Sequence, residues 1–175
     1  MVRDTATFAS GCFWCTESDF EKVPGVLDAV SGYTGGRVPN PTYEQVSTGR
    51  TGHREAVQVI YDPARVSYAR LLDVFWRNVD PVDARGQFCD KGYQYTSAIY
   101  VSSAEERRLA DSSKRALDQS GRLRKPVVTE IAAAAPFYAA EAYHQAYYRK
   151  NPIRYRYYRT NCGRDRRLRE LRRGT

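Results

Sequence analysis

The sequence lacks a long hydrophobic run. No stretch of about 18 or more consecutive apolar residues occurs, which excludes a conventional transmembrane helix. The opening segment, MVRDTATFASGCF, also has no apolar core of the kind that a secretory signal peptide requires. We therefore expect a cytoplasmic protein that makes no contact with a membrane.

Cysteine and histidine are scarce. The chain has four cysteines and two histidines, namely Cys12, Cys15, Cys89, Cys162, His53 and His144. A chain of 175 residues can bury a core without disulfide staples, and cytoplasmic thiols stay reduced, so catalytic or transiently paired thiols are favoured over a disulfide framework. A zinc site would need a second C-x-x-C pair or two closely spaced histidines, and neither is present. We predict no metal and no other bound cofactor.

Internal repeats and low-complexity linkers are absent as well, so we predict a single domain over residues 1–175. Runs rich in β-branched or aromatic residues predict strands at Ala6–Ser10, Val26–Tyr33, Ala56–Tyr61, Tyr95–Val101 and Val127–Ile131. Helical signals occur over Cys12–Lys22, over Ser67–Val79 with Ser67 as N-cap, from a Ser102–Glu105 capping box to Gln119, and over Phe137–Tyr148.

The order of the first six predicted elements is β-α-β-β-α-β. This order matches a split β-α-β arrangement, in which helices cover an antiparallel sheet. We therefore predict an α+β, two-layer sandwich with a ferredoxin-like core and additional helices. The stretches 32–52 and 79–92 show no clear periodicity, and loops of that length in a compact domain usually carry function.

Positive charge is concentrated at the end of the chain. The formal net charge is +8, and residues 161–175 hold six arginines against Asp165 and Glu170. A basic nucleic-acid-binding module is one hypothesis for such a segment. A solvated basic C-terminal tail or helix face is the more common origin of a charge run, so we expect no nucleic-acid partner and a monomeric protein.

The segment TFASGCFWCTESDF places Cys12 at the point where a strand gives way to a helix. A helix N-terminus favours a thiolate, which is the nucleophilic form of cysteine. Phe13 and Trp14 follow, and they form either an apolar wall beside the sulfur or ordinary core packing. Cys12 and Cys15 together also form a C-x-x-C pair, so a general dithiol–disulfide oxidoreductase is a second hypothesis.

Six segments taken together resemble the methionine sulfoxide reductase A family. They are GCFWCTESDF at 11–20, GYTGG at 32–36, NPTYEQV at 40–46, TGHREAVQVIYDP at 51–63, CDKGYQYTSAIY at 89–100 and PFYAAEAYHQAYY at 136–148. The resemblance implies reduction of free and protein-bound methionine-S-sulfoxide to methionine, and hence repair of oxidised proteins.

The resemblance also assigns roles to residues. Cys12 would be the nucleophile, and Phe13 and Trp14 would hold the substrate's methyl group. Glu55 would be the acid that protonates the sulfoxide oxygen, since a carboxyl in a partly apolar pocket keeps its proton at neutral pH. The remaining residues implied around that oxygen are Tyr43, Asp90 and Tyr95.

The reaction would leave Cys12 as a sulfenic acid, which a second thiol converts to a disulfide. The resemblance implies thioredoxin as the reductant that reopens it. Cys162, Cys15 and Cys89 are the candidates for the resolving thiol, and Cys162 is favoured because it follows the last motif in a segment expected to be mobile. The chain departs from many relatives in carrying Cys15 and in lacking a glycine-rich tail with two cysteines.

Overall fold

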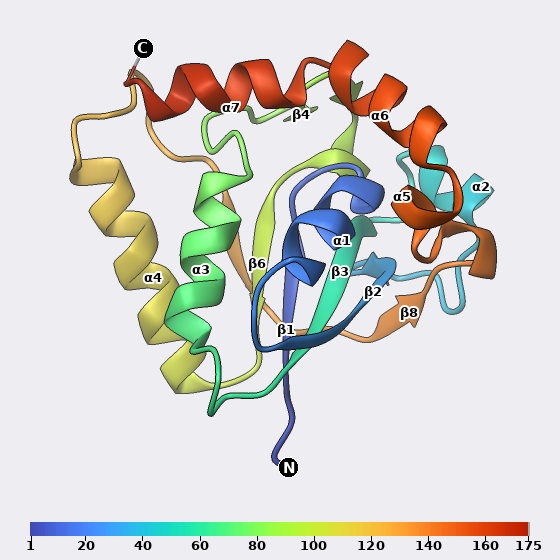
Figure 1. The fold of residues 1–175 in the computed structure, drawn as a ribbon, viewed down its shortest axis with the longest axis horizontal. Helices are drawn as coiled ribbons and strands as arrows, with labels where there is room; N and C mark the ends of the chain where they lie inside the picture. The colour runs from blue at the N-terminus through green and yellow to red at the C-terminus, as the bar shows by residue number, and fades with distance from the viewer. Residues whose placement is uncertain (175) are drawn as a thin grey trace.

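The computed structural model describes residues 1–174 and has a mixed α+β architecture (Figure 1). Its main sheet has the strand order β7-β6-β1-β3-β2-β8. The bounds are β1 Asp4–Ala9, β2 Val26–Thr34, β3 Arg54–Tyr61, β6 Ala98–Val101, β7 Glu130–Ala133 and β8 Phe137–Ala139. Neighbouring strands run antiparallel except β6 and β7, which are parallel. The predicted α+β class is confirmed.

Three helices are the principal cover of the sheet: α1 (Phe13–Glu21), α3 (Tyr68–Arg77) and α4 (Ala104–Gln119). The chain ends in α5 (Tyr147–Lys150), α6 (Pro152–Asn161) and α7 (Arg164–Arg172). The smaller elements are α2 (Tyr43–Ser47), the hairpin β4 (Gly86–Gln87) and β5 (Asp90–Lys91), and the 3-10 turns Tyr93–Tyr95 and Ala142–His144. Helix α2 and this hairpin come from the two stretches without periodicity, and the first 3-10 turn directly follows the second stretch.

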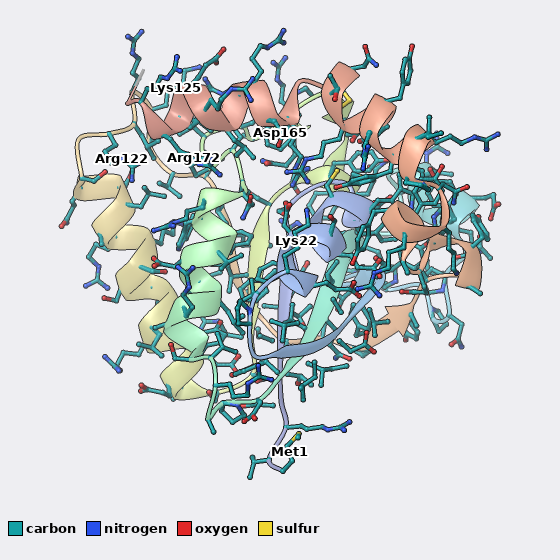
Figure 2. The ribbon with its side chains drawn as sticks, in the orientation of Figure 1. Met1, Lys22, Arg122, Lys125, Asp165 and Arg172 are labelled. Atoms are coloured by element: carbon teal, nitrogen blue, oxygen red, sulfur yellow. A yellow bond between two sulfur atoms is a disulfide. The ribbon has the colours of Figure 1, made fainter. Side chains whose placement is uncertain are left out.

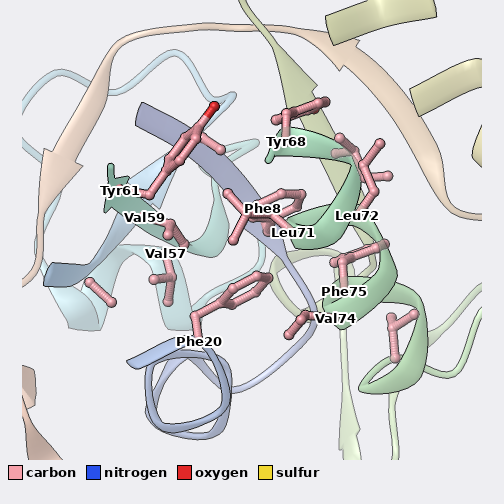
Figure 3. Close-up of a cluster of buried hydrophobic side chains, with 14 of the residues drawn as sticks. Phe8, Phe20, Val57, Val59, Tyr61, Tyr68, Leu71, Leu72, Val74 and Phe75 are labelled. Carbon is pink, nitrogen blue, oxygen red and sulfur yellow. The ribbon is translucent and has the colours of Figure 1, made fainter. Parts of the chain in front are cut away.

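The largest core cluster lies between the sheet and helices α1 and α3, and Phe8 of β1 stands at its centre (Figure 3). Its ring stacks on Phe20 of α1 at 4.8 Å and on Phe75 of α3 at 5.5 Å between centroids. Residues at alternate positions of β3, such as Val57 and Val59, point into the same cluster because side chains alternate across a strand.

Phe8→Ala is expected to destabilise the protein by about 3–5 kcal/mol, because it removes a fully buried ring that contacts both helices. Chemical denaturation with a probe for global unfolding measures this loss. Leu27→Ala, at a residue that is 37% exposed, is the matched control and should cost well under half as much. Equal losses in the two variants would contradict the central role of Phe8.

Several element bounds differ from the sequence prediction. The helix predicted over Phe137–Tyr148 is wrong: Phe137 pairs with Thr34 of β2 and begins an edge strand, and only a 3-10 turn and the start of α5 follow. The strand predicted from Val127 begins at Glu130 as β7, since its parallel pairing with β6 begins where Glu130 lies opposite Ala98. The predicted capping box of Ser102 and Glu105 does not form: the N-cap of α4 is Ser103, whose hydroxyl accepts from the Glu106 N–H, and the Glu106 carboxylate accepts from the Ser102 N–H.

Within the basic segment that begins at residue 161, Arg164–Arg172 form helix α7. Arg164, Leu168 and Leu171 are buried on its inner side, which anchors this helix to the domain. Residue 175, the last of the predicted tail, lies outside the described residues. Over residues 1–174, no helix is both long and apolar enough to cross a membrane.

Candidate active site

Cys12 occupies the turn between β1 and α1 and is the N-cap residue of α1, with φ −52° and ψ 118°. Its carbonyl accepts from the backbone N–H groups of Cys15 and Thr16 at 3.1 and 3.3 Å, which closes the first helical turn. The hydroxyls of Ser10 and Thr16 lie 2.6 Å apart and tie the end of the strand to that turn. The sequence thus fixes the sulfur at a helix N-terminus, as predicted.

Gly11 makes this turn possible. Its φ of +86° lies in the region that favours glycine, and a Cβ there would lie 2.6 Å from Cβ of Gln87. Gln87 itself is fully buried and exchanges two hydrogen bonds with the backbone of Asp80. A residue with a side chain at position 11 would therefore displace either the turn or a fixed neighbour.

A cavity of about 240 Å³ opens at Cys12. The residues that line it are Cys12, Phe13, Trp14, Tyr43, Glu55, Asp90, Tyr95 and Tyr158. The structure therefore brings together every residue predicted to bind or act on substrate, from five separate parts of the chain. Tyr158 of α6 is an addition that the sequence did not indicate, because tyrosine is abundant and no motif surrounds this one. The one predicted site residue outside the lining is Cys162.

Glu55 lies near the start of β3 and is only 3% exposed. One carboxyl oxygen accepts from the backbone N–H of Phe13 at 3.1 Å. Burial raises the pKa of Glu55 from 4.5 to about 8, and the Phe13 N–H opposes this shift only in part. The carboxyl therefore keeps its proton at neutral pH and can deliver it into the cavity.

Burial also raises the pKa values of the other polar side chains around the cavity. Burial raises the pKa values of the Tyr43 and Tyr95 hydroxyls, and nearby Glu55 raises them further, so both remain hydrogen-bond donors. Burial likewise raises the pKa of Asp90, whose carboxylate accepts from the hydroxyl of Tyr158. Hydroxyl donors facing one point of a cavity can stabilise an oxyanion.

The apolar wall of the cavity is held in place from behind. The Trp14 ring stacks on Tyr147 with centroids 3.8 Å apart, and its indole N–H donates to Nδ1 of His144 at 3.0 Å. Phe13 contacts the same histidine ring at 5.1 Å. Phe13 belongs to the buried core as well as to the cavity, so both of its sequence-based interpretations apply.

Cys12 and Cys15 carry free thiols, exposed by 6% and 1%, that share a hydrogen bond. Burial raises the pKa of Cys12 well above its ordinary value, and the neighbouring Cys15 raises it further. The hydrogen bond from Cys12 lowers the pKa of Cys15, and the charges of Arg164 and Arg159 lower it further. The environment of the pair therefore favours the thiolate of Cys15 over that of Cys12.

Cys89 and Cys162 form a disulfide that joins the β4–β5 hairpin to the end of α6. Cys89 is exposed, and Cys162 is the C-cap of α6, so it does not belong to a free tail. Sequence reasoning named both residues but did not pair them, because 73 positions separate them. With Asp90 they form the one group of three potential metal ligands within residues 1–174, but two of these ligands are joined to each other.

The terminal helix also contributes to the site. The buried guanidinium of Arg164 donates to the Ser10 carbonyl at 2.8 Å, directly before the Gly11 turn. The other charged side chains of this region are largely exposed, and Arg122, Lys125 and Arg172 gather where α4 and α7 end (Figure 2). Part of the basic segment is therefore structural, and part of it is a solvated surface.

Comparison with known proteins gives the family. The model for peptide methionine sulfoxide reductase matches residues 4–174. The chain belongs to this family. The peptide methionine sulfoxide reductase MsrA of Ligilactobacillus salivarius is 54% identical over 155 residues, which cover 89% of this chain and 90% of that protein. The MsrA of Bacillus subtilis is 50% identical over 162 residues, or 93% and 92% of the two chains.

Solved structures agree with this peptide methionine sulfoxide reductase in fold. The reduced form of Mxr1 from Saccharomyces cerevisiae superimposes with a TM-score of 0.78 at 34% identity, over 86% of this chain and 87% of that one. Methionine sulfoxide reductase A of Corynebacterium diphtheriae gives 0.76 at 34% identity, over 86% and 76%. The family predicted from six sequence segments is therefore confirmed.

Proposed function

We propose that the cavity binds the side chain of methionine-S-sulfoxide, free or within a protein, and that Cys12 reduces it to methionine in the repair of oxidised proteins. The single observation that carries this proposal is the placement of a cysteine and a protonated carboxyl, Glu55, in one cavity with an aromatic wall. This is the combination that removal of an oxygen from sulfur requires: a nucleophile for the sulfur and a proton for the oxygen.

The sulfur of Cys12 attacks the sulfoxide sulfur while Glu55 protonates the oxygen, and the proton that leaves the Cys12 thiol restores Glu55 to its neutral form. Tyr43 and Tyr95 donate to the oxygen as negative charge develops on it, and Asp90 orients this polar side of the cavity. The oxygen ends on Cys12 as a sulfenic acid, and the substrate sulfur leaves as the thioether of methionine. Phe13 and Trp14 hold the terminal methyl group, since an apolar wall favours a methyl over a solvated polar group.

A second thiol then condenses with the sulfenic acid, water leaves, and thiol–disulfide exchange restores the enzyme. We propose thioredoxin as the reductant and include Cys162 among the relay thiols. The structure of the Mxr1 protein of yeast has also been solved in complex with Trx2.

We further propose that the protein is a cytoplasmic monomer with no nucleic-acid partner and no bound cofactor. We also propose a split β-α-β core, which the antiparallel strand order β6-β1-β3-β2 supports.

Reduction of separated S and R epimers of a methionine sulfoxide peptide, with dithiothreitol as reductant, tests the proposal. The S epimer should turn over and the R epimer should not, because one enzyme type serves each epimer. Wild-type turnover of neither epimer, or of the R epimer alone, would contradict it. A general dithiol oxidoreductase would instead reduce protein disulfides with Cys12 and Cys15, but both are nearly inaccessible.

A further inference from the structure

The four cysteines form two pairs that differ in exposure. Cys12 and Cys15 lie in the cavity or behind it and are almost fully buried, whereas Cys89 is exposed on the β4–β5 hairpin. A protein reductant must reach a sulfur atom directly, because disulfide exchange requires attack of one sulfur on another. The pair at the reaction centre is therefore closed to a protein, and the pair at the surface is open to one.

We propose that the disulfide is transferred from the buried pair of cysteines to the exposed pair. Cys15 forms the first disulfide with Cys12. Thiol–disulfide exchange then moves this disulfide to Cys89 and Cys162, where a dithiol protein reduces it. This inference rests on the proposed function, since it begins with the Cys12 sulfenic acid. It assigns the resolving role to Cys15 rather than to Cys162.

The position of Cys15 supports its role as the resolving thiol. Cys12 is the N-cap and has non-helical backbone angles, and its carbonyl accepts from the Cys15 N–H at 3.1 Å, so the two side chains can converge across the first turn. Cys12 lowers the pKa of Cys15, and two guanidinium groups lower it further: that of Arg164 on α7, which is buried, and that of Arg159 on α6, which is 14% exposed. A thiol whose charged form is favoured is the better nucleophile towards a sulfenic acid.

Cys162 lies in a different environment. Its sulfur is bonded to Cys89 and lies 3.8 Å from the hydroxyl of Tyr158, whose ring is part of the cavity wall. The cavity and the surface pair are therefore separated by one tyrosine side chain. Tyr158 precedes Cys162 by about one turn of helix, so a small movement of the end of α6 brings the sulfur to the cavity once the bond to Cys89 is open.

The chemistry balances at each step. Cys15 attacks the Cys12 sulfenic acid, its proton and the hydroxyl leave as water, and the Cys12–Cys15 disulfide forms. The Cys162 thiolate attacks this disulfide, and Cys89 then attacks Cys162, which returns Cys12 and Cys15 to thiols. The partner's first thiolate attacks Cys89 and releases Cys162, and its second thiol closes the partner's own disulfide. The structure has free thiols at Cys12 and Cys15 and a disulfide between Cys89 and Cys162, which is the pairing expected after transfer of the disulfide and before the partner reacts.

The test is a reaction without added reductant. Protein reduced at all four cysteines is mixed anaerobically with excess methionine-S-sulfoxide peptide, and methionine per chain is counted before and after thiols are alkylated for disulfide mapping. We expect about two methionines per chain for wild type, because each consumes one dithiol pair. Cys162→Ser should give about one and accumulate the Cys12–Cys15 disulfide, and Cys89→Ser should also give about one.

Cys15→Ser decides between the two resolving thiols. We expect it to form about one methionine and to leave Cys12 as a sulfenic acid that dimedone traps. A Cys12–Cys162 or Cys12–Cys89 disulfide in this variant, formed as fast as the first wild-type disulfide, would overturn the proposal. So would the absence of a Cys12–Cys15 disulfide in Cys162→Ser. Failure to form any methionine in wild type would instead refute the proposed function, so the two failures are distinguishable.

Addition of a reduced thioredoxin tests the surface pair separately. It should drive repeated turnover in wild type, and that turnover should fall by at least about tenfold in Cys89→Ser, since the exposed sulfur is lost. Ser113→Ala is the control variant: it removes a hydroxyl far from every cysteine in sequence, and its thioredoxin-driven turnover should match that of wild type. Full thioredoxin-driven turnover in Cys89→Ser would show that the partner reaches the cavity directly and would overturn this step.

Discussion

Replacing Cys12 with serine is expected to reduce sulfoxide reduction by roughly 10⁶-fold, which is the scale of loss when a covalent nucleophile is removed. A serine hydroxyl is a poor nucleophile at neutral pH, and Glu55 cannot activate it as a base, because burial keeps this carboxyl protonated. Methionine released from the S epimer in a single turnover is the quantity to measure.

Cys15→Ser is the matched control for the Cys12 variant, since it also replaces a buried thiol of the same pair. It should still release methionine in the first turnover. Thermal melting of both variants establishes that the domain is folded. Methionine formation by folded Cys12→Ser at a rate close to that of wild type would contradict the role of Cys12.

Replacing Glu55 with glutamine should slow the reaction by roughly 10²–10⁴-fold, the usual contribution of a positioned general acid. Glutamine retains an oxygen that can accept from the Phe13 N–H, so the local hydrogen bond can be kept while the acidic proton is lost. Because the pKa of Glu55 is raised to about 8, the wild-type rate should fall as pH rises through about 8. The variant should lose this step in its pH profile.

The pH dependence of the free energy of unfolding also tests the raised pKa of Glu55. A carboxyl whose pKa rises from 4.5 to about 8 on folding binds more protons in the folded state between these values. Its contribution to stability is therefore complete below pH 4.5 and is lost as pH rises towards 8. Denaturation of Glu55→Gln across this range should show a shallower decline than wild type. Identical pH profiles of both rate and stability would refute the assignment.

The parts of the fold that follow from local pattern were predictable. The helix over α3 has regularly spaced apolar residues and a serine N-cap, and the structure has Ser67 in that position, where it accepts from the Arg70 N–H. The turn at Gly11 and the helix start at Cys12 were equally local. The grouping of distant residues such as Glu55 and Asp90 around Cys12 came from the family resemblance, because no local rule brings them together.

What sequence reasoning missed depends on tertiary pairing. Phe137–Tyr148 contains many residues compatible with a helix, but its first residues find backbone partners on β2 and become a strand. Tyr158 enters the cavity and Cys162 meets Cys89 only because α6 folds back over the β4–β5 hairpin. The burial of Arg164 likewise depends on a carbonyl acceptor supplied by Ser10.

The contact between Arg164 and Ser10 has a consequence for how the protein is made. It joins residues 154 positions apart, on either side of nearly the whole domain, and it supports the loop that carries Cys12. During synthesis the strand and helix around Cys12 emerge first, and the partner that secures them emerges 154 residues after Ser10. A nascent chain would therefore expose a reactive cysteine in an unfinished setting until α7 has been made and enclosed it.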